Sequence, residues 1–551
     1  MVITDILSRN AELYGGDTAL IEVNPELQER IDRAWKEFDL VQELPKPIHR
    51  REITWKEFDD SANKLAHYFL SEGVTKGKKV AILLMNCLEW LPIYFGTLKT
   101  GAVVCPMNFR YSADEIAYCL DLSQSNVLIF GQAFISRINE VKDKLTGVDE
   151  FIYVGNREDT PAYASFYDDL VADMPTAAVR IAIGEDEDAA IYFSSGTTGF
   201  PKAVLHTQKS LLASCYTENN NHHQTKDDVF LCIPPLYHTG AKMHWFGSFL
   251  VGGKAVLLRG VRPDWILKTV SEEGCTIVWL LVPWAQDILD AIDAGKVNLS
   301  DYKLDQWRLM HIGAQPVPPS LIKRWKKVFP HHDYDTNYGL TESLGPGCVH
   351  LGMENIHKVG AIGIPGKGWE AEIWDENHNP VPNGKVGELA VRGVSVMKCY
   401  YRDPEATSKC LFGDWLLTGD MAERDEDGFI YLVDRKKDVI ISGGENLYPV
   451  EIENFIRAND KVKDVAVIGT PDKRLGEIAT AIIEIKEGMS ATVEEIATFC
   501  EGMPRYKRPK QIIFDDIPRN PTGKIEKPRL RKKYCAEPVV AMQNEIDVKV
   551  D

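Results

Sequence analysis

Strand-like apolar runs alternate with amphipathic helical segments along most of this 551-residue chain, and this alternation limits the folds open to it. Residues 53–73 predict a helix, because Thr54 and Glu57 form a capping box and apolar side chains recur behind them at helical spacing. The apolar run KKVAILLM follows directly, and similar runs occur at 127–130 and 277–282. Strand–helix–strand units of this kind predict an α/β fold, in which layered, largely parallel β-sheets are flanked by helices.

The pattern changes after residue 380, where short strands and turns replace the longer units. A compact stretch of helices and strands follows. Because the chain is too long for one ordinary domain, we predict a large N-terminal domain at residues 1–436 and a small C-terminal α+β domain at 437–540. The charged segment 25–50 has helical character, and we interpret it as a solvated surface insert.

Charge and composition exclude several classes of protein. The formal net charge of −18 argues against a nucleic-acid-binding surface, which needs clustered Lys and Arg. Eleven cysteines are dispersed from Cys87 to Cys535 without CxxC pairs, which favours reduced thiols over a disulfide framework or a zinc site. We find no secretory signal pattern and no apolar run near the ~18 residues of a membrane helix. We therefore expect a cytoplasmic protein with no transmembrane segment, and a homo-oligomer is left open.

The stretch IYFSSGTTGFPKAV (191–204) has the residues of a phosphate-binding loop. Strand-like IYF leads into small residues that can expose backbone N–H groups and hydroxyls to oxyanions, and Lys202 adds a positive charge. The loop is not a Walker A sequence, because that motif places its lysine at the start of a helix, whereas Lys202 follows a proline. We interpret the stretch as a phosphate site; a Ser/Thr-rich surface turn is the alternative.

Five further motifs follow in order: HIGAQPV (311–317), NYGLTES (337–343), WLLTGD (415–420), DRKKDVIISGGENLYPVEIE (434–453) and PRNPTGKIEK (518–527). Together with the phosphate loop they resemble the signature series of the adenylate-forming (AMP-binding) superfamily, which contains acyl-CoA synthetases, luciferases and peptide-synthetase adenylation domains. The resemblance runs from about residue 50 to 530. It implies an AMP-forming acyl-CoA synthetase, in which ATP and a carboxylic acid give acyl-AMP and pyrophosphate and coenzyme A then displaces AMP.

The resemblance also implies roles for motif residues. Thr341 would contact the α-phosphate, and Glu342 would bind Mg²⁺ together with Thr198, since Mg²⁺ prefers oxygen ligands. Lys524 would bridge the incoming carboxylate and the α-phosphate during adenylation only. The residues expected to contact ATP or AMP are Ser195, Gly196, Thr197, Thr198, Gly199, Lys202, Gly313, Ala314, Gln315, Asn337, Tyr338, Gly339, Asp420 and Arg435.

Within that set, Tyr338 would stack on adenine, while Asp420 and Arg435 would approach the ribose. Lys437 matches the hinge position of the superfamily, so the small domain is expected to be mobile and to rotate between the two half-reactions. The rotation would present Gly443, Gly444 and Glu445 to coenzyme A. The basic run 505–508 could also meet phosphates of coenzyme A, and a solvated loop is an equal alternative.

The stretch PPLYHTGAKMHWFGSFLVGG (234–253) resembles the acyl-pocket segment of the superfamily. His238 would lie beside the carboxylate as a catalytic residue, and the tail pocket would be lined by Tyr237, Gly240, His244 and Gly345. Outward orientation of Lys242 and His244 is an alternative. No Asp or Glu occurs between residues 231 and 256, which disfavours an amino-acid substrate, because amino-acid adenylation domains usually place an acid there.

Small side chains at Gly339, Ser343 and Gly345 favour a medium-chain fatty, aryl or alicyclic carboxylate over acetate. Two other functions are left open. One is an adenylation enzyme that loads a carrier protein in trans, since no carrier domain is apparent after PTGKIEK. The other is a non-catalytic acyl-nucleotide sensor, which would be expected to have lost Lys524 or Glu342, both of which are present.

Overall fold

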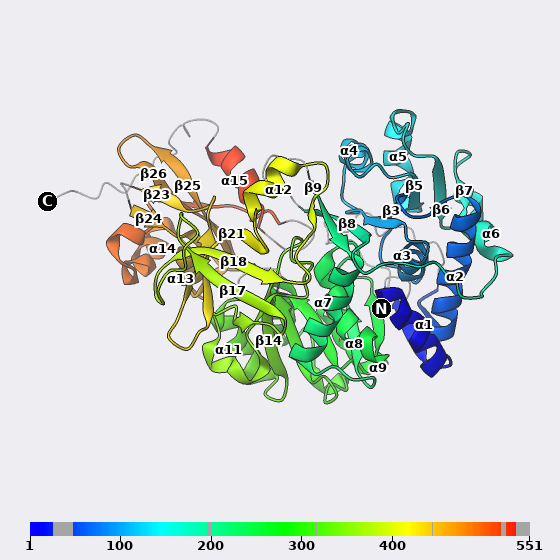
Figure 1. Cartoon of the computed structure of the whole chain (residues 1–551). Coiled ribbons are helices and arrows are strands. Elements are labelled where there is room, and N and C mark those ends of the chain that lie inside the picture. Colours follow the sequence, from blue (N-terminus) through cyan, green and yellow to red (C-terminus); the bar gives the residue numbers. More distant parts are fainter. Residues whose placement is uncertain (26–47, 195–200, 314–316, 443–444, 520–524, 536–551) are drawn as a thin grey trace.

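The computed structural model describes residues 1–25, 48–194, 201–313, 317–442, 445–519 and 525–535 (Figure 1). Two large sheets with parallel interiors, one antiparallel sheet and one mixed sheet near the C-terminus make up the fold. The predicted α/β class, with a large N-terminal and a small C-terminal part, is therefore confirmed. Most of the charged segment, residues 26–47, lies outside the described residues.

The larger of the two parallel-centred sheets in the N-terminal part has nine strands. Its interior is parallel, and antiparallel strands lie at both edges. In sheet order the strands are β16 (Ile364–Pro365), β15 (Val349–His350), β14 (Asp333–Tyr338), β13 (Leu309–Gly313), β12 (Ile277–Leu281), β10 (Val229–Cys232), β11 (Lys254–Leu258), β1 (Thr18–Val23) and β2 (Arg50–Thr54). Helices of this part are α1 (Ile3–Tyr14), α7 (Gln208–His222), α8 (Thr239–Val251), α9 (Pro263–Glu273), α10 (Val282–Asp293) and α11 (Pro319–Val328).

An eight-stranded sheet contains the two strands that flank the predicted phosphate loop in the sequence, β8 and β9. Its order is β19 (Cys399–Tyr400), β9 (Lys202–Thr207), β8 (Asp188–Ser194), β4 (Val103–Pro106), β3 (Lys79–Leu83), β5 (Val127–Gly131), β6 (Glu150–Val154) and β7 (Ser165–Phe166), and only the pairs that involve β9 are antiparallel. Its helices are α2 (Trp55–Ser71), α3 (Trp90–Lys99), α4 (Ala113–Ser123), α5 (Ile135–Val141) and α6 (Tyr167–Ala172). The predicted helix at 53–73 is α2, and the capping box of Thr54 and Glu57 is present.

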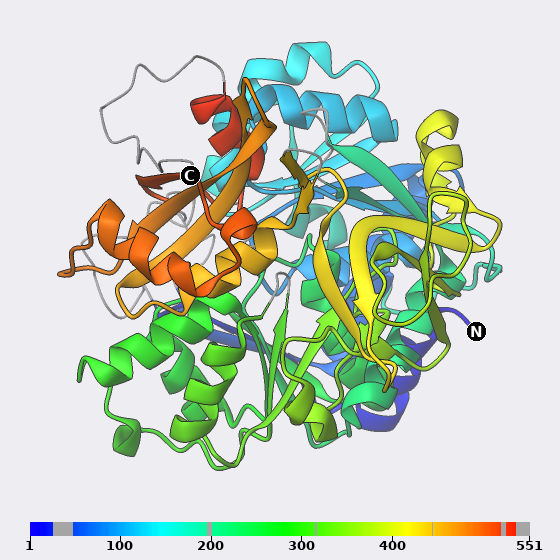
Figure 2. The same cartoon turned by 90° about the vertical axis from the view of Figure 1, so that its left-hand side faces the viewer.

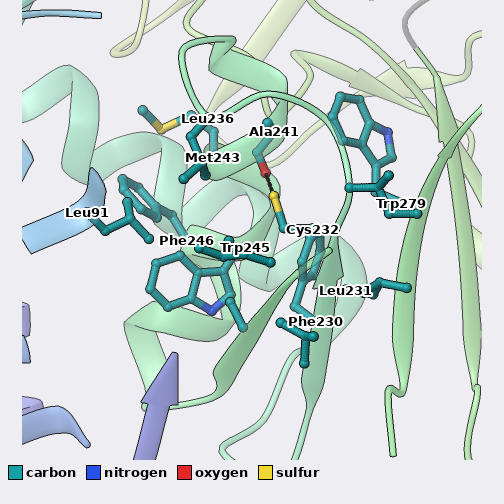
Figure 3. Packing of buried hydrophobic residues seen from close by; sticks show 14 of the residues in the cluster. Leu91, Phe230, Leu231, Cys232, Leu236, Ala241, Met243, Trp245, Phe246 and Trp279 are labelled. Atoms are coloured by element: carbon teal, nitrogen blue, oxygen red, sulfur yellow. Dashed lines mark hydrogen bonds between the residues drawn. The ribbon is translucent and has the colours of Figure 1, made fainter. Parts of the chain in front are cut away.

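Aromatic and aliphatic side chains fill the space between the two large sheets. Trp55 of α2 stacks on Trp245 of α8, with ring centroids 6.4 Å apart, and both are fully buried. Figure 3 shows α8 and β10 from close by, where Phe246 faces Leu91 of α3. Because apolar groups of helices from both sheets share this one core, the sheets are held in a fixed relation on either side of it.

The antiparallel sheet follows in the sequence and consists of β17 (Trp369–Trp374), β18 (Gly387–Gly393), β21 (Trp415–Arg424), β20 (Leu411–Phe412) and β22 (Ile430–Arg435), with α12 (Pro404–Cys410) beside it. The C-terminal sheet comprises β23 (Ile440–Ser442), β24 (Glu445–Leu447), β25 (Val462–Asp472), β26 (Gly476–Ile485) and β27 (Gln511–Phe514), and only β27 pairs in parallel.

Helices cover both faces of the C-terminal sheet (Figure 2). Val465 and Val467 of β25 pack with α13 (Pro449–Arg457) and α14 (Val493–Phe499), whereas Ala466 and Ile468 pack with α15 (Lys527–Tyr534). This alternation is the period-2 pattern of a strand covered on both faces. Lys437 lies between β22 and β23, and the domain boundary there stays a prediction.

Two predicted absences concern thiols and membranes. All eleven cysteines are free and none forms a disulfide, as their spacing suggested. The helices within the described ranges are too short or too polar to span a bilayer.

Candidate nucleotide and acyl site

Four of the predicted nucleotide residues, Gly313, Asn337, Tyr338 and Gly339, lie where β13 and β14 end. Gly313 ends β13, Tyr338 ends β14, and Gly339 follows. The two strands approach closely here: a Cβ on Gly313 would lie 2.9 Å from the Asn337 Oδ1 atom. Parallel α/β sheets bind ligands at the carboxyl ends of their strands, so this edge is the expected place for a nucleotide.

Tyr338 and Asp420 are brought together from two different sheets. The Tyr338 hydroxyl donates a hydrogen bond of 2.5 Å to Asp420 Oδ2. Burial of the ring, and then the charge of Asp420, raise the pKa of Tyr338 well above its usual value, so the phenol keeps its proton. Arg435 lies directly opposite Asp420 in the pairing of β21 with β22. The three residues assigned to adenine and ribose therefore share one corner.

Tyr400, which was not predicted from the sequence, contacts both Lys202 and Glu342. Tyr400 lies opposite Val204 in the pairing of β19 with β9, and Lys202 is two residues away on the same face of β9. The Lys202 Nζ atom is 4.4 Å from the centre of the Tyr400 ring, and the Tyr400 hydroxyl donates to Glu342 Oε1 at 2.8 Å. The Glu342 carboxylate supplies the oxygen donors that Mg²⁺ prefers, and it lies beside the predicted triphosphate lysine, so it fits a magnesium ligand.

His206 is a second residue that the motifs did not reveal. It lies on the same face of β9 as Lys202, and its Nε2 atom is 2.8 Å from the main-chain oxygen of Thr341. Burial lowers the pKa of His206 to about 4, so the ring is neutral at pH 7 and its Nε2–H donates to that oxygen. The neutral imidazole thus fixes the backbone of the YGLTE segment.

Within the acyl segment, His238 is the N-cap residue of α8, and its Nδ1 atom accepts a hydrogen bond from Gly240 N at 3.2 Å. Gly240 and Gly345 face one another: a Cβ on Gly345 would lie 3.6 Å from Gly240 Cα. On its other side, a Cβ on Gly240 would lie 2.8 Å from the ring of Trp279. Tyr237 packs edge-on against Phe109, with ring centroids 5.4 Å apart.

The outward orientation of Lys242 and His244 is wrong, because both side chains are buried. Lys242 Nζ donates to the main-chain oxygen of Leu236 at 3.0 Å and lies 4.3 Å from the centre of the Tyr192 ring. Burial lowers the pKa of Lys242 well below its usual value. His244 lies against Trp279, with ring centroids 4.7 Å apart.

The segment 231–256 contains no acidic residue, but an acidic side chain from another helix packs against it. Glu218 of α7 places its Oε1 atom 2.7 Å from His244 Nδ1. The sequence window missed this acid because α7 and α8 are separated along the chain and meet only through packing. Glu218 Oε1 is engaged by histidines, so its presence does not by itself supply a partner for a substrate ammonium group.

Several predicted site residues lie outside the described ranges: Ser195, Gly196, Thr197, Thr198, Gly199, Ala314, Gln315, Gly443, Gly444 and Lys524. Glu445 begins β24, where its backbone pairs with Ser442. In the basic run 505–508, Lys507 forms an ion pair with Glu451 at 2.5 Å, and Arg508 donates to the main-chain oxygens of Met503 and Glu501.

The described fold and site define an α/β enzyme with a large and a small part and a polar site at the carboxyl ends of its parallel strands. Comparison with protein-family models then identifies the family: residues 37–401 match the AMP-binding enzyme model, and residues 451–524 match the AMP-binding enzyme C-terminal domain. The chain belongs to the AMP-binding enzyme family.

Relatives agree over nearly the whole length. A long-chain-fatty-acid–CoA ligase of Mycobacterium tuberculosis is 31% identical, with 88% of this chain and 93% of the relative covered. A crotonobetaine/carnitine–CoA ligase of Citrobacter koseri is 30% identical, with 95% and 97% covered. The crystal structure of an anthranilate CoA ligase in complex with anthranoyl-AMP superposes with a TM-score of 0.86 at 25% identity, covering 97% of this chain and 98% of that one. The chain is thus an acid–thiol ligase by family.

Proposed function

We propose that the chain is an AMP-forming acyl-CoA synthetase that acts on a medium-chain fatty, aryl or alicyclic carboxylic acid. The observation that carries the proposal is a pair of contacts to the segment 338–342, at and after the end of β14: Tyr338 bonds to Asp420, and Glu342 bonds to Tyr400, over whose ring Lys202 lies. Two anionic side chains and one cation around this segment match a ligand with hydroxyls at one end and phosphates at the other.

In the first half-reaction a carboxylate oxygen attacks the α-phosphorus, the bond to the β-phosphate oxygen breaks, and pyrophosphate leaves. Lys202, Thr197 and Thr198 would bind the β- and γ-phosphates, and Lys524 would bridge the carboxylate and the α-phosphate. Mg²⁺, held by Glu342 and Thr198, would neutralise charge on the triphosphate. His206 donates to the main-chain oxygen of Thr341. This bond would keep Thr341 in position for its proposed contact with the α-phosphate.

In the second half-reaction the sulfur of coenzyme A attacks the acyl carbon, AMP leaves, and the thiol proton passes to solvent. Rotation of the small part about Lys437 would withdraw Lys524 and bring Gly443, Gly444 and Glu445 to the thiol. His238, at the start of α8, would lie beside the reacting carboxylate in both steps.

The substrate class is supported by the acyl segment. Gly240 and Gly345 carry no side chain where α8 and the loop after β14 approach one another, and the ring of Trp279 lies against Gly240 as an apolar surface. The relatives' substrates, which by their names range from long-chain fatty acids to carnitine and anthranilate, are compatible with a pocket of this kind.

The experiment is pyrophosphate release from ATP and Mg²⁺, with and without coenzyme A, over acetate, C4–C10 acids, benzoate and cyclohexane carboxylate. Turnover that requires coenzyme A and centres on one cluster of acids other than acetate supports the proposal. Pyrophosphate release that ignores coenzyme A would point to a carrier protein as acceptor and overturn the thioester step. Acetate as the best substrate would overturn the substrate class.

A further inference from the structure

A group of histidines and carboxylates is buried between α7, α8 and the sheet strands β13 to β15. Glu218 and His222 come from one turn of α7, His311 from β13 and Asp335 from β14, and all four have no exposed surface. None of the four was predicted as a site residue, and only His311 lies within a motif, HIGAQPV. Buried ionisable groups at this density require partners, because a charged or polar group without one is costly in the protein interior.

Three atoms of the group lack hydrogen-bond partners among the described residues: His222 Nδ1, His311 Nδ1 and Glu218 Oε2. His222 Nδ1 is 2.9 Å from Glu218 Oε1, and His311 Nδ1 is 3.6 Å from the same oxygen, but neither contact has the geometry of a hydrogen bond. The ligand atoms of Glu218, His222 and His311 all lie within 4.8 Å of one another. Ligands at the ~2.0–2.1 Å distances of a tetrahedral zinc site are about 3.3 Å apart, and the two nitrogen–oxygen distances bracket that value.

The outer nitrogens of both histidines are already held. His222 Nε2 is 2.6 Å from Asp335 Oδ2, and His311 Nε2 is 2.9 Å from Asn337 Oδ1. If each Nε2 carries the proton and donates to its acceptor, each Nδ1 presents a lone pair toward Glu218. This is the usual arrangement around a metal, where a ligating imidazole donates its other N–H to a carboxylate or carbonyl oxygen.

A second combination, His222 with Asp335 and His350, also brings three ligand atoms together. Its atoms are already paired, because Asp335 accepts from His222, from His350 Nδ1 at 3.0 Å and from Gly352 N at 2.9 Å. Asp335 is therefore an orienting residue for His222, and the unpaired atoms select Glu218, His222 and His311 as the ligand set.

We propose that Glu218, His222 and His311 bind one divalent transition-metal ion, with Zn²⁺ as the first candidate. Two imidazoles and one carboxylate suit Zn²⁺ and its neighbours in the first transition row, whereas Mg²⁺ and Ca²⁺ take oxygen ligands. His244, with its Nδ1 atom 2.7 Å from Glu218 Oε1, borders the fourth position. The cysteine spacing gave no sign of such a site because none of the three ligands is a thiolate.

The test measures bound metal and does not depend on ligase activity, so it is separate from the test of the proposed function. Tag-free protein is expressed with Zn²⁺ in the medium and desalted, and its metal content is measured by mass spectrometry. We expect about one Zn²⁺ per chain in the wild type, and loss of that ion in Glu218→Gln and His311→Gln. Asp335→Asn should retain the ligands but bind Zn²⁺ roughly 10- to 100-fold more weakly in a chelator competition.

The matched control is His332→Gln, because His332 is also buried but packs against Phe329 and Trp307, outside the group. It should keep the ion. A wild type that carries no more Zn²⁺ than Glu218→Gln and His311→Gln, or a folded His332→Gln that loses it equally, would overturn the proposal. Should the ligand variants fail to fold, Co²⁺-loaded wild type decides: intense visible bands of a tetrahedral Co²⁺ ion support the site, and a spectrum of aqueous Co²⁺ refutes it.

Discussion

Replacement of Tyr400 by phenylalanine isolates one hydrogen bond at the proposed magnesium ligand. The change removes the hydroxyl that donates to Glu342 Oε1 at 2.8 Å, but it keeps the ring over which Lys202 Nζ lies at 4.4 Å. The cation–ring contact and the packing of β19 on β9 should therefore survive. What is lost is the group that fixes the direction of the Glu342 carboxylate.

The size of the effect follows from the charge and burial of the pair. A hydrogen bond to a charged group contributes ~1.5–3 kcal/mol, and Tyr400 is only 9% exposed, so water does not readily replace the hydroxyl. If that bond orients Glu342 in the transition state, kcat/KM for ATP should fall roughly 10- to 150-fold. The Mg²⁺ concentration for half-maximal rate should rise as well, because a carboxylate that is free to turn binds the ion less well.

The assay is pyrophosphate release at saturating acid, with ATP and Mg²⁺ varied independently. Tyr401→Phe is the matched control, because Tyr401 is the next residue and its hydroxyl donates at 2.8 Å to Gln124, away from the site. Thermal unfolding of both variants checks that the fold is intact. A Tyr400→Phe enzyme that matches Tyr401→Phe within about twofold in kcat/KM and in Mg²⁺ requirement would refute the reasoning.

Three further predictions address other parts of the site. Lys524→Ala should abolish pyrophosphate release while coenzyme A still converts supplied acyl-AMP to acyl-CoA, as measured by thioester formation; equal loss of both half-reactions would contradict the two-conformation account. Gly240→Ala should shift preference to shorter or slimmer acids in a competition assay, because the new Cβ would lie 2.8 Å from the Trp279 ring, and an unchanged profile would exclude this wall from the tail pocket. His206→Gln should lose less free energy of unfolding than the wild type when the pH falls from 7 to 4.5. The pKa of wild-type His206 is about 4 in the folded state and 6.5 in the unfolded state. Its contribution to the free energy of unfolding is therefore complete above pH 6.5, and about 3 kcal/mol of it is lost between pH 6.5 and 4. Chemical denaturation of both proteins at pH 7 and pH 4.5 measures the difference, and parallel loss of stability would show that His206 does not titrate in this way.

Local patterns were sufficient for the secondary structure and for part of the site. The capping box at Thr54 and the alternation of strands and helices depend on residues close in sequence, so they could be predicted from the sequence. Motif order likewise pointed to Tyr338 and Asp420, although their hydrogen bond joins residues 82 positions apart. Tyr400, His206 and Glu218 carry no motif, and their roles arise only when β19, β9 and α7 pack against other elements.

The orientation of α8 shows the same limit in physical terms. The sequence of α8 mixes apolar and basic residues, and it did not determine whether Lys242 and His244 are buried or face solvent. The structure buries every residue from Thr239 to Leu250, because α8 is enclosed by α7, the sheet and the aromatic core. Burial of the two basic side chains is possible because Leu236 and Glu218, on neighbouring segments, accept their hydrogen bonds.

The contacts beside Lys437 determine what a rotation of the small part would require. On one side, Asp434 of β22 accepts a hydrogen bond from Val450 N at the start of α13, at 2.9 Å, and burial raises the pKa of this carboxyl to about 6. On the other side, Asp438 forms an ion pair with Arg531 of α15 at 2.7 Å. A pivot at Lys437 leaves the Asp438 pair intact, since both partners move together, but it must break the bond between Asp434 and α13. The bond of Asp434 to α13 therefore favours the arrangement described here, and the proposed thioester-forming arrangement has to supply contacts that replace it.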